Sequence, residues 1–252
     1  MNLYSLAIGI TGSLLQILLL WRGWRCGLFS RFPLFYSYIA YVLSGSTLAF
    51  LIFQIHPSYY LGFYWRFFLV LLLVEFGVLL EISDHMFDPY PAIRRLGRFL
   101  AGCVCGIFSF YIVSALMQPR SLSVTTLDLF KRVSITKAAV IIVLLAIARY
   151  YRLPVGKNVA GLMVGFSVYL GINIVNFALA ETFGRAVYGS MFAVVGPLSF
   201  TVCLLIWTIK VWRYEPVLQE AGRVTGAAHK VSEPVIYQID RLNQTLTRVL
   251  RR

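Results

Sequence analysis

One carboxylate lies well inside an apolar stretch of the sequence. Glu75 stands in the segment LLLVEFGVLLEI, within a predicted membrane span over residues 61–81. At about 1.5 Å per residue along a helix, this position is about 9 Å from the inner membrane surface. Gln16, Tyr38 and Tyr41, on the first two predicted spans, fall near the same depth. An ionisable group in a bilayer needs such partners, so we expect these four residues to form a hydrogen-bonded intramembrane cluster.

In that cluster Glu75 could carry a proton or hold the amine of a ligand. The alternative is a neutral glutamic acid that pins helices together, since burial disfavours the charged form of a carboxylate. Glu81, at the end of the same apolar run, is expected to be an interfacial residue.

A second polar group is predicted in the outer half of the membrane. It combines two cations and two amides with two tyrosines, a set that would suit an anionic headgroup or a carboxylate. The alternative is that the cations reach the outer headgroups along their aliphatic stems while the amides lock helices together. The residues of this candidate outer pocket are Lys137, Arg66, Tyr64, Tyr169, Asn173 and Asn176.

Small residues and amides form one stripe on the predicted sixth span. Gly161, Gly165, Tyr169, Asn173 and Asn176 are spaced by four, four, four and three residues, so they share one helix face. In hydrocarbon such a face turns inward, because small residues let backbones approach and amides need partners.

A related pattern, G-[RK]-x-x-A-G-x-x-x-G, occurs at 97–106 and again at 156–165. It predicts helix packing at Gly102 and Gly106 as well as at Gly161 and Gly165. The pattern is also compatible with a first helix followed by three related hairpins, as in transporters with internal repeats. Chance recurrence of small residues, which are common in any membrane bundle, is the alternative.

Several chemistries lack their usual residues. The histidines do not cluster, and the sequence holds no metal-type Cys pair, so no metal site is predicted. No GxSxG, phosphate-loop or HExxH motif occurs, and we expect neither a cofactor nor catalytic residues. A retinal protein would need a lysine near the middle of its last span, whereas Lys210 stands at the inner end.

The elements that position these residues are predicted to be membrane helices. The chain has 252 residues, of which 59% are hydrophobic and only 13% charged, well below the usual charged fraction of soluble proteins, about 25%. The net charge of +13 is therefore assigned to membrane topology, and no nucleic-acid partner is expected. The predicted class is an all-α bundle of seven transmembrane helices in the lipid bilayer of the inner (plasma) membrane.

Seven apolar runs have the length that a hydrocarbon core of about 30 Å requires. They lie at approximately 3–20, 33–53, 61–81, 98–117, 133–148, 159–180 and 189–212, within a membrane domain over 1–213. The fifth run is the weakest, since it is short and carries Lys137 about one turn after its start. With the N-terminus outside, most of the 23 basic residues fall on the inner side, which favours a cytoplasmic C-terminus.

The cytoplasmic tail over 214–252 has a different composition. Apolar residues at 235, 239, 242, 246 and 249 follow one face of a predicted amphipathic helix over 233–250, and several arginines accompany them. Such a helix either lies on the anionic inner leaflet or contacts a membrane or cytoplasmic protein partner.

Two of the predicted inner loops resemble loops of known membrane proteins. The segments EISDHMFDPYPAIRRLGR at 81–98 and YYRLPVGKNVAG at 150–161 resemble loops of bacterial seven-span integral membrane proteins that have no assigned activity. The resemblance implies the seven-helix fold and the inner-membrane location, and it carries no catalytic motif.

Three functions are compatible with these features. The first is a non-enzymatic, sensor-like or accessory membrane subunit with an outer pocket and a contacting tail. The second is a small-solute or proton-coupled transporter that uses Glu75 and the polar face of the sixth helix. A lipid-modifying enzyme is the least supported, because one carboxylate without a base, nucleophile or metal is a poor catalytic set.

Overall fold

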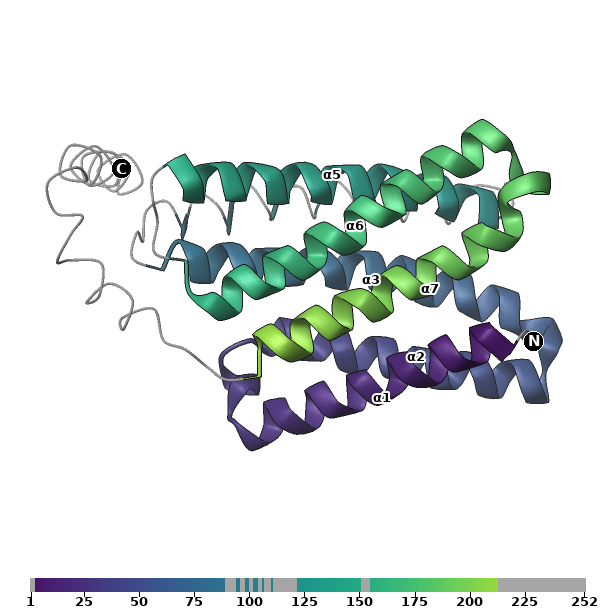
Figure 1. The fold of residues 1–252 in the computed structure, drawn as a ribbon, viewed down its shortest axis with the longest axis horizontal. Coiled ribbons are helices and arrows are strands. Elements are labelled where there is room, and N and C mark those ends of the chain that lie inside the picture. The colour runs from purple at the N-terminus through teal and green to yellow at the C-terminus, as the bar shows by residue number, and fades with distance from the viewer. Residues whose placement is uncertain are drawn as a thin grey trace, which may run out of the picture.

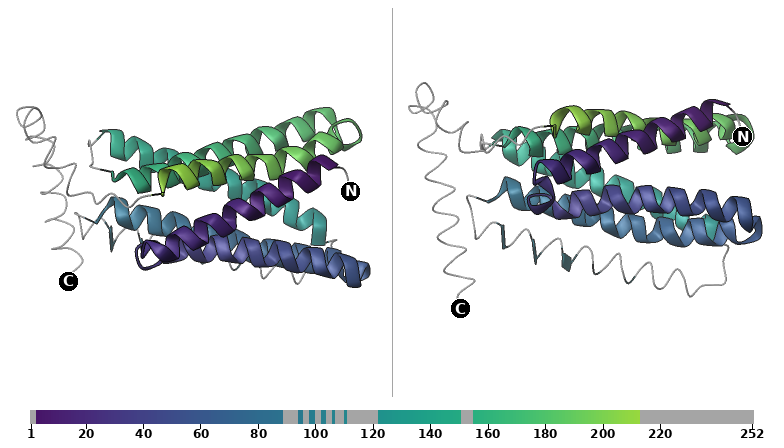
Figure 2. Two further views of the ribbon diagram at one scale, coloured as in Figure 1. Left: turned by 60° about the horizontal axis from the view of Figure 1, so that its bottom comes forward. Right: turned by 90° about the horizontal axis from the view of Figure 1, so that it is seen from below.

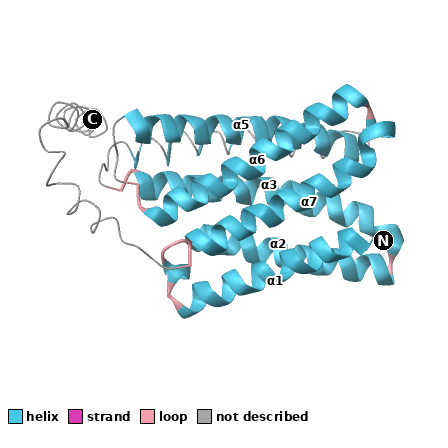
Figure 3. Cartoon of the chain, viewed as in Figure 1, coloured by secondary structure: helices cyan, strands magenta, loops and turns pink. Residues whose placement is uncertain are grey.

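A computed structural model describes residues 3–88, 122–150 and 155–212, together with positions 94–95, 98–99, 102–103, 106 and 110. Most of the predicted span over 98–117 and the whole predicted tail helix over 233–250 lie outside these residues. Within the described residues the fold is all-helical, with six α-helices and no strand (Figure 3). The expected fold class is therefore confirmed at the level of an all-α protein.

The helices are longer than the predicted spans. α5, in particular, begins about three turns before residue 133, where the fifth span was expected to start. The described helices are α1 (Leu3–Arg25), α2 (Pro33–Ile55), α3 (Pro57–Met86), α5 (Leu122–Tyr150), α6 (Lys157–Phe183) and α7 (Arg185–Lys210), with a 3₁₀ turn at Leu28–Ser30.

Proline and glycine mark the ends of these helices. Pro33 and Pro57 open α2 and α3, in the first turn, where a backbone N–H would have no acceptor within the helix. Gly27 and Gly184 have positive φ angles of 65° and 75°, which side chains other than glycine rarely tolerate. These two glycines allow the tight connections from α1 to the 3₁₀ turn and from α6 to α7.

The helices lie lengthwise beside one another in a bundle (Figure 1). α6 packs on α7 and α2 packs on α3, while α1 lies against α7 and α5 contacts both α3 and α6. Figure 2 shows α1, α6 and α7 on one side of the bundle and α2 and α3 on the other. The residues between these two sides form the core.

Three of the described helical segments are long and apolar enough to cross a membrane. They are Ala7–Arg25, Pro33–Ile55 and Lys157–Phe183, and a shorter apolar helix covers Val194–Lys210. These segments suggest a membrane-embedded protein. The count of seven spans and the orientation of the termini stay predictions.

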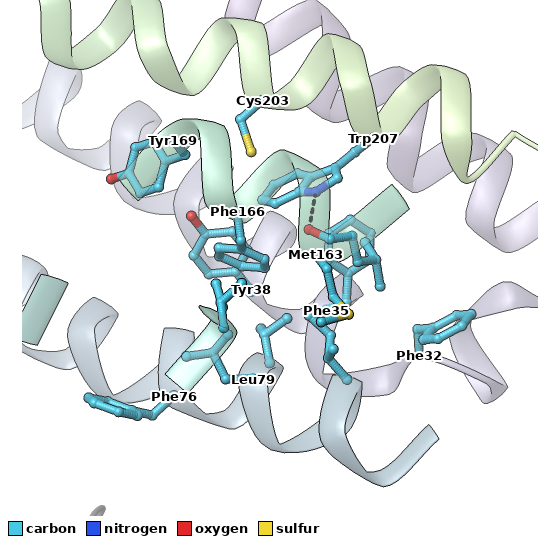
Figure 4. Packing of buried hydrophobic residues seen from close by; sticks show 14 of the residues in the cluster. Phe32, Phe35, Tyr38, Phe76, Leu79, Met163, Phe166, Tyr169, Cys203 and Trp207 are labelled. Atoms are coloured by element: carbon cyan, nitrogen blue, oxygen red, sulfur yellow. Dashed lines mark hydrogen bonds between the residues drawn. The ribbon is translucent and has the colours of Figure 1, made fainter. Parts of the chain in front are cut away.

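The core between the two sides is aromatic (Figure 4). The Trp207 indole lies with its centroid 4.8 Å from the Phe166 ring and 5.1 Å from the Phe35 ring. Its Nε1 donates a hydrogen bond of 3.2 Å to the carbonyl oxygen of Leu162, so this buried donor is satisfied. The indole therefore fastens α7 to α6 and also contacts α2.

The glycines of the stripe on α6 make room for α7. A Cβ added at Gly161 would collide with Lys210, and one added at Gly165 would collide with the Trp207 indole. Small residues at these two positions thus let the helices approach closely. Gly102 and Gly106 are both exposed, and an added Cβ would meet no atom of the described residues within 4 Å. Helix packing at these two positions stays a prediction.

Candidate ligand pocket and buried ion pair

A buried ion pair joins α3 to α5. The Lys137 ammonium donates to Oε2 of Glu75, and each side chain is only 1% exposed. The Tyr38 hydroxyl, from α2, donates to the other carboxylate oxygen at 3.4 Å. The Lys137 Nζ atom also lies 5.9 Å from the centroid of the Phe76 ring, within the range of a cation–π contact. Three helices thus meet at one carboxylate.

This pairing corrects the assignment of Lys137 to the outer pocket. Glu75 and Lys137 were predicted to lie in different polar groups, and the alternative for Lys137 was that its side chain reaches the outer headgroups. The early start of α5 puts Lys137 about 22 Å along that helix, counted from Leu122. Each charge would cost several kcal/mol if buried alone, and the partner offsets much of that cost.

Two members of the predicted inner cluster do not reach Glu75. The Tyr41 hydroxyl donates instead to the carbonyl oxygen of Phe67 at 3.2 Å, and the two rings stack with centroids 4.4 Å apart. Gln16 is buried on α1, and its Oε1 has no hydrogen-bond partner among the described residues. Only Tyr38, of the three expected partners, contacts the carboxylate. The pairing of Lys137 with Glu75 was not predicted, since pairing across helices depends on which helices are neighbours.

Beside this pair lies a pocket of about 720 Å³ between α2, α3, α5, α6 and α7. Ten of its 21 described lining residues are aromatic. Four phenylalanine rings form a continuous row: Phe68 to Phe130 at 4.9 Å, Phe130 to Phe177 at 5.2 Å, and Phe177 to Phe192 at 5.3 Å between centroids. Because each ring comes from a different helix, this row closes one wall of the pocket from α3 to α7.

Four residues of the candidate outer pocket do line this space, namely Tyr64, Tyr169, Asn173 and Asn176. The Asn173 side-chain amide donates to the Tyr169 carbonyl oxygen at 2.8 Å and to the Ser199 hydroxyl at 3.1 Å. The amide stripe of α6 therefore faces both α7 and the pocket.

The two predicted cations of the outer pocket are not among its described lining residues. Arg66 is exposed on α3, and Lys137 is buried against Glu75. A different cation, Lys131, lines the pocket and pairs with Glu181 at 2.6 Å. The expected anion site thus lacks the free cations on which the expectation depended. Lys131 was missed because it lay between two predicted spans, whereas α5 includes it.

The pocket and the ion pair share one side chain. Tyr38 lines the pocket and also donates to Glu75, and Leu71, one turn before Glu75 on α3, is a lining residue. Figure 4 shows Tyr38 and Tyr169 within the same packed region. A ligand that displaced Tyr38 would therefore change the environment of the buried pair.

Glu81 has a structural role that the sequence did not indicate. Its two carboxylate oxygens accept hydrogen bonds from the backbone N–H groups of Leu34 at 2.9 Å and Phe35 at 2.8 Å. The residue before α2, Phe32, has no side chain that could cap the helix. Glu81 supplies this missing anion from α3 and so fixes the start of α2 against α3.

No protein-family model, curated protein or solved structure matches the chain. Among the described residues no group of His, Cys, Asp and Glu could hold a metal ion.

Proposed function

We propose that the protein is a non-enzymatic, sensor-like or accessory subunit of the inner membrane that binds a small amphipathic molecule in the aromatic pocket. In this proposal the chain has seven transmembrane helices, an outer N-terminus and a cytoplasmic C-terminus. The single observation that supports it most is the pocket of about 720 Å³ that residues of five helices line. Ligand sites are typically apolar and aromatic clefts of about 300–1,000 Å³ with a few polar groups.

The buried pair fits a positioning role within this proposal. The Glu75 carboxylate is held by Lys137 and by the Tyr38 hydroxyl, so its position and that of Tyr38 depend on each other. A ligand contacting Tyr38 would be sensed at the junction of α2, α3 and α5. Because the three helices share contacts at Glu75, a shift of one helix changes the contacts of the other two. A movement caused by ligand binding could be transmitted through the protein in this way.

The second part of the proposal is that the tail contacts the inner leaflet or a protein partner. The arginine-bearing apolar seam over 233–250 supports contact with the inner leaflet or with a protein partner. Removing residues 235–252 should release a partner from complexes isolated in mild detergent. Complexes of unchanged mass would refute this part.

The pocket is tested by filling it. Gly196 lines the pocket on α7, and a Cβ added there meets no atom within 4 Å, so Gly196→Phe should occupy the pocket without a backbone collision. Gly9 on α1 has the same open surroundings and is not among the lining residues, so Gly9→Phe is the matched control. Native mass spectrometry should find a small molecule on the wild type and on the control, and none on Gly196→Phe. Equal retention by all three proteins would contradict the proposal.

Transport is the second candidate, and one observation favours it. Tyr38 connects the pocket directly to the buried ion pair, as coupling between a solute and a proton would require. In proteoliposomes a transporter should lose solute-driven proton movement on Glu75→Gln while the protein still folds. If the wild type moves no protons with any solute that the pocket binds, this candidate fails.

A further inference from the structure

Two buried polar atoms on the pocket-lining residues have no hydrogen-bond partner among the described residues. They are the indole Nε1 of Trp65, a donor, and the amide Oδ1 of Asn176, an acceptor. The Asn176 side chain is 2% exposed, and its Nδ2 already donates to the Phe192 carbonyl oxygen at 3.4 Å. Because buried polar atoms are nearly always satisfied, an unpaired donor and an unpaired acceptor at one pocket indicate a missing partner that offers both functions.

We infer that the pocket prefers an uncharged amphipathic ligand whose polar group both donates and accepts a hydrogen bond, such as an alcohol or a primary amide. This inference rests on the proposed function and adds the chemical class of the ligand. A hydroxyl group offers both an acceptor for the Trp65 indole and a donor for the Asn176 carbonyl oxygen, whereas a carboxylate cannot donate and an ammonium cannot accept.

The charges at the pocket support the same class. Among its described lining residues only Lys131 and Glu181 are charged, and Lys131 Nζ lies 2.6 and 2.7 Å from the two Glu181 carboxylate oxygens. An anionic ligand would have to compete with Glu181 for Lys131, and a cationic ligand would have to compete with Lys131 for Glu181. A neutral ligand leaves this pair intact and fills the space with apolar contact.

The row of four phenylalanines favours a ligand whose remaining part is apolar. These rings, which run from Phe68 to Phe192, offer faces and edges to a flat or chain-like apolar body. Aromatic faces also attract cations, so a cationic probe belongs in any test of ligand class.

The test uses probes with one apolar body and different polar groups. The wild type is reconstituted in lipid nanodiscs and titrated with 1-pyrenebutanol, 1-pyrenebutanoate, 1-pyrenebutylammonium and 1-butylpyrene. Energy transfer from tryptophan to pyrene reports occupancy, because Trp65 lies at the pocket. Gly196→Phe nanodiscs, whose pocket is filled, provide the background from probe dissolved in lipid.

The alcohol should bind at least about tenfold more tightly than each of the other three probes, because one net hydrogen bond of about 1.4 kcal/mol supplies a factor of ten and 1-butylpyrene lacks both bonds. In Asn176→Leu the affinity for the alcohol should fall toward that of 1-butylpyrene, while the affinity for 1-butylpyrene itself should not fall. The comparison of probes on the wild type stands even if this variant does not fold.

The outcomes separate this inference from the proposed function. Equal or tighter binding of the carboxylate or the ammonium overturns the inference and leaves ligand binding in the pocket intact. Equal binding of the alcohol and 1-butylpyrene also overturns it, since the polar atoms then contribute nothing. Binding of no probe above the Gly196→Phe background overturns both the inference and the proposed function.

Discussion

Lys137→Met should be strongly destabilising, and the structure gives the size of the effect. Lys137 and Glu75 are each 1% exposed, so no solvent screens the charge that remains when its partner is removed. Removing one member of a buried pair costs about 3–5 kcal/mol. For a chain of this size, at about 2–4 °C per kcal/mol, the thermal midpoint should fall by about 6–20 °C.

The double variant Glu75→Gln with Lys137→Met tests the buried ion pair more stringently than either single variant. Replacing both charged groups by neutral side chains of similar volume removes the uncompensated charge, so most of the lost stability should return. The interaction energy in the double-mutant cycle should then be about 3 kcal/mol, near the upper end for residues in contact. The measurement is tryptophan fluorescence during heating, in one detergent–lipid mixture and at one scan rate.

The exposed pair at the pocket supplies the control. Lys131 and Glu181 are 37% and 61% exposed, and Lys131→Met should cost at most about 1 kcal/mol because exposed pairs are weak. If Lys137→Met is no more destabilising than Lys131→Met, the buried pair is not formed in the protein. Strictly additive effects of Glu75→Gln and Lys137→Met would lead to the same conclusion.

Two further substitutions test the packing of the helices that surround the pocket. Gly165→Leu should destabilise the protein by at least about 1–3 kcal/mol, because the new side chain collides with the Trp207 indole. Gly171→Leu, on the same helix but with no atom near an added Cβ, is its control, and equal midpoints for the two variants would show that α6 and α7 do not pack as described. Glu81→Ala should cost about 1.5–3 kcal/mol by removing a charged acceptor from two backbone N–H groups of α2, and hydrogen exchange of the first turn of α2 should rise. Unchanged exchange there would remove the capping role from Glu81.

The sequence was sufficient for the features that follow from local spacing. The stripe from Gly161 to Asn176 predicted an inward face of α6, and all of its members are buried. The second span was predicted to begin at residue 33, where α2 begins. Glu75 stood out because a carboxylate in an apolar run is costly under any arrangement of the helices. These inferences need only helix geometry and the cost of burial.

The partners of these residues could not be predicted in the same way. Glu75 and Lys137 are 62 positions apart, and their contact depends on α3 and α5 being neighbours. The predicted position of Lys137, about one turn after the start of the fifth span, was also wrong, because α5 begins at Leu122 and not near residue 133. Gln16 and Glu75 were predicted to lie at similar depths in the membrane, but depth does not show on which side of the bundle a residue lies. Only the packed structure shows that Asn176 leaves an acceptor unsatisfied at the pocket.

The most direct measurement for the central proposal is native mass spectrometry of the protein purified from its own membrane in mild detergent. The wild type and Gly9→Phe should carry a small molecule that Gly196→Phe lacks, and tandem fragmentation should identify that molecule as an uncharged amphipathic compound. If Gly196→Phe, with its pocket filled, retains the same molecule in the same proportion, ligand binding in the aromatic pocket is contradicted.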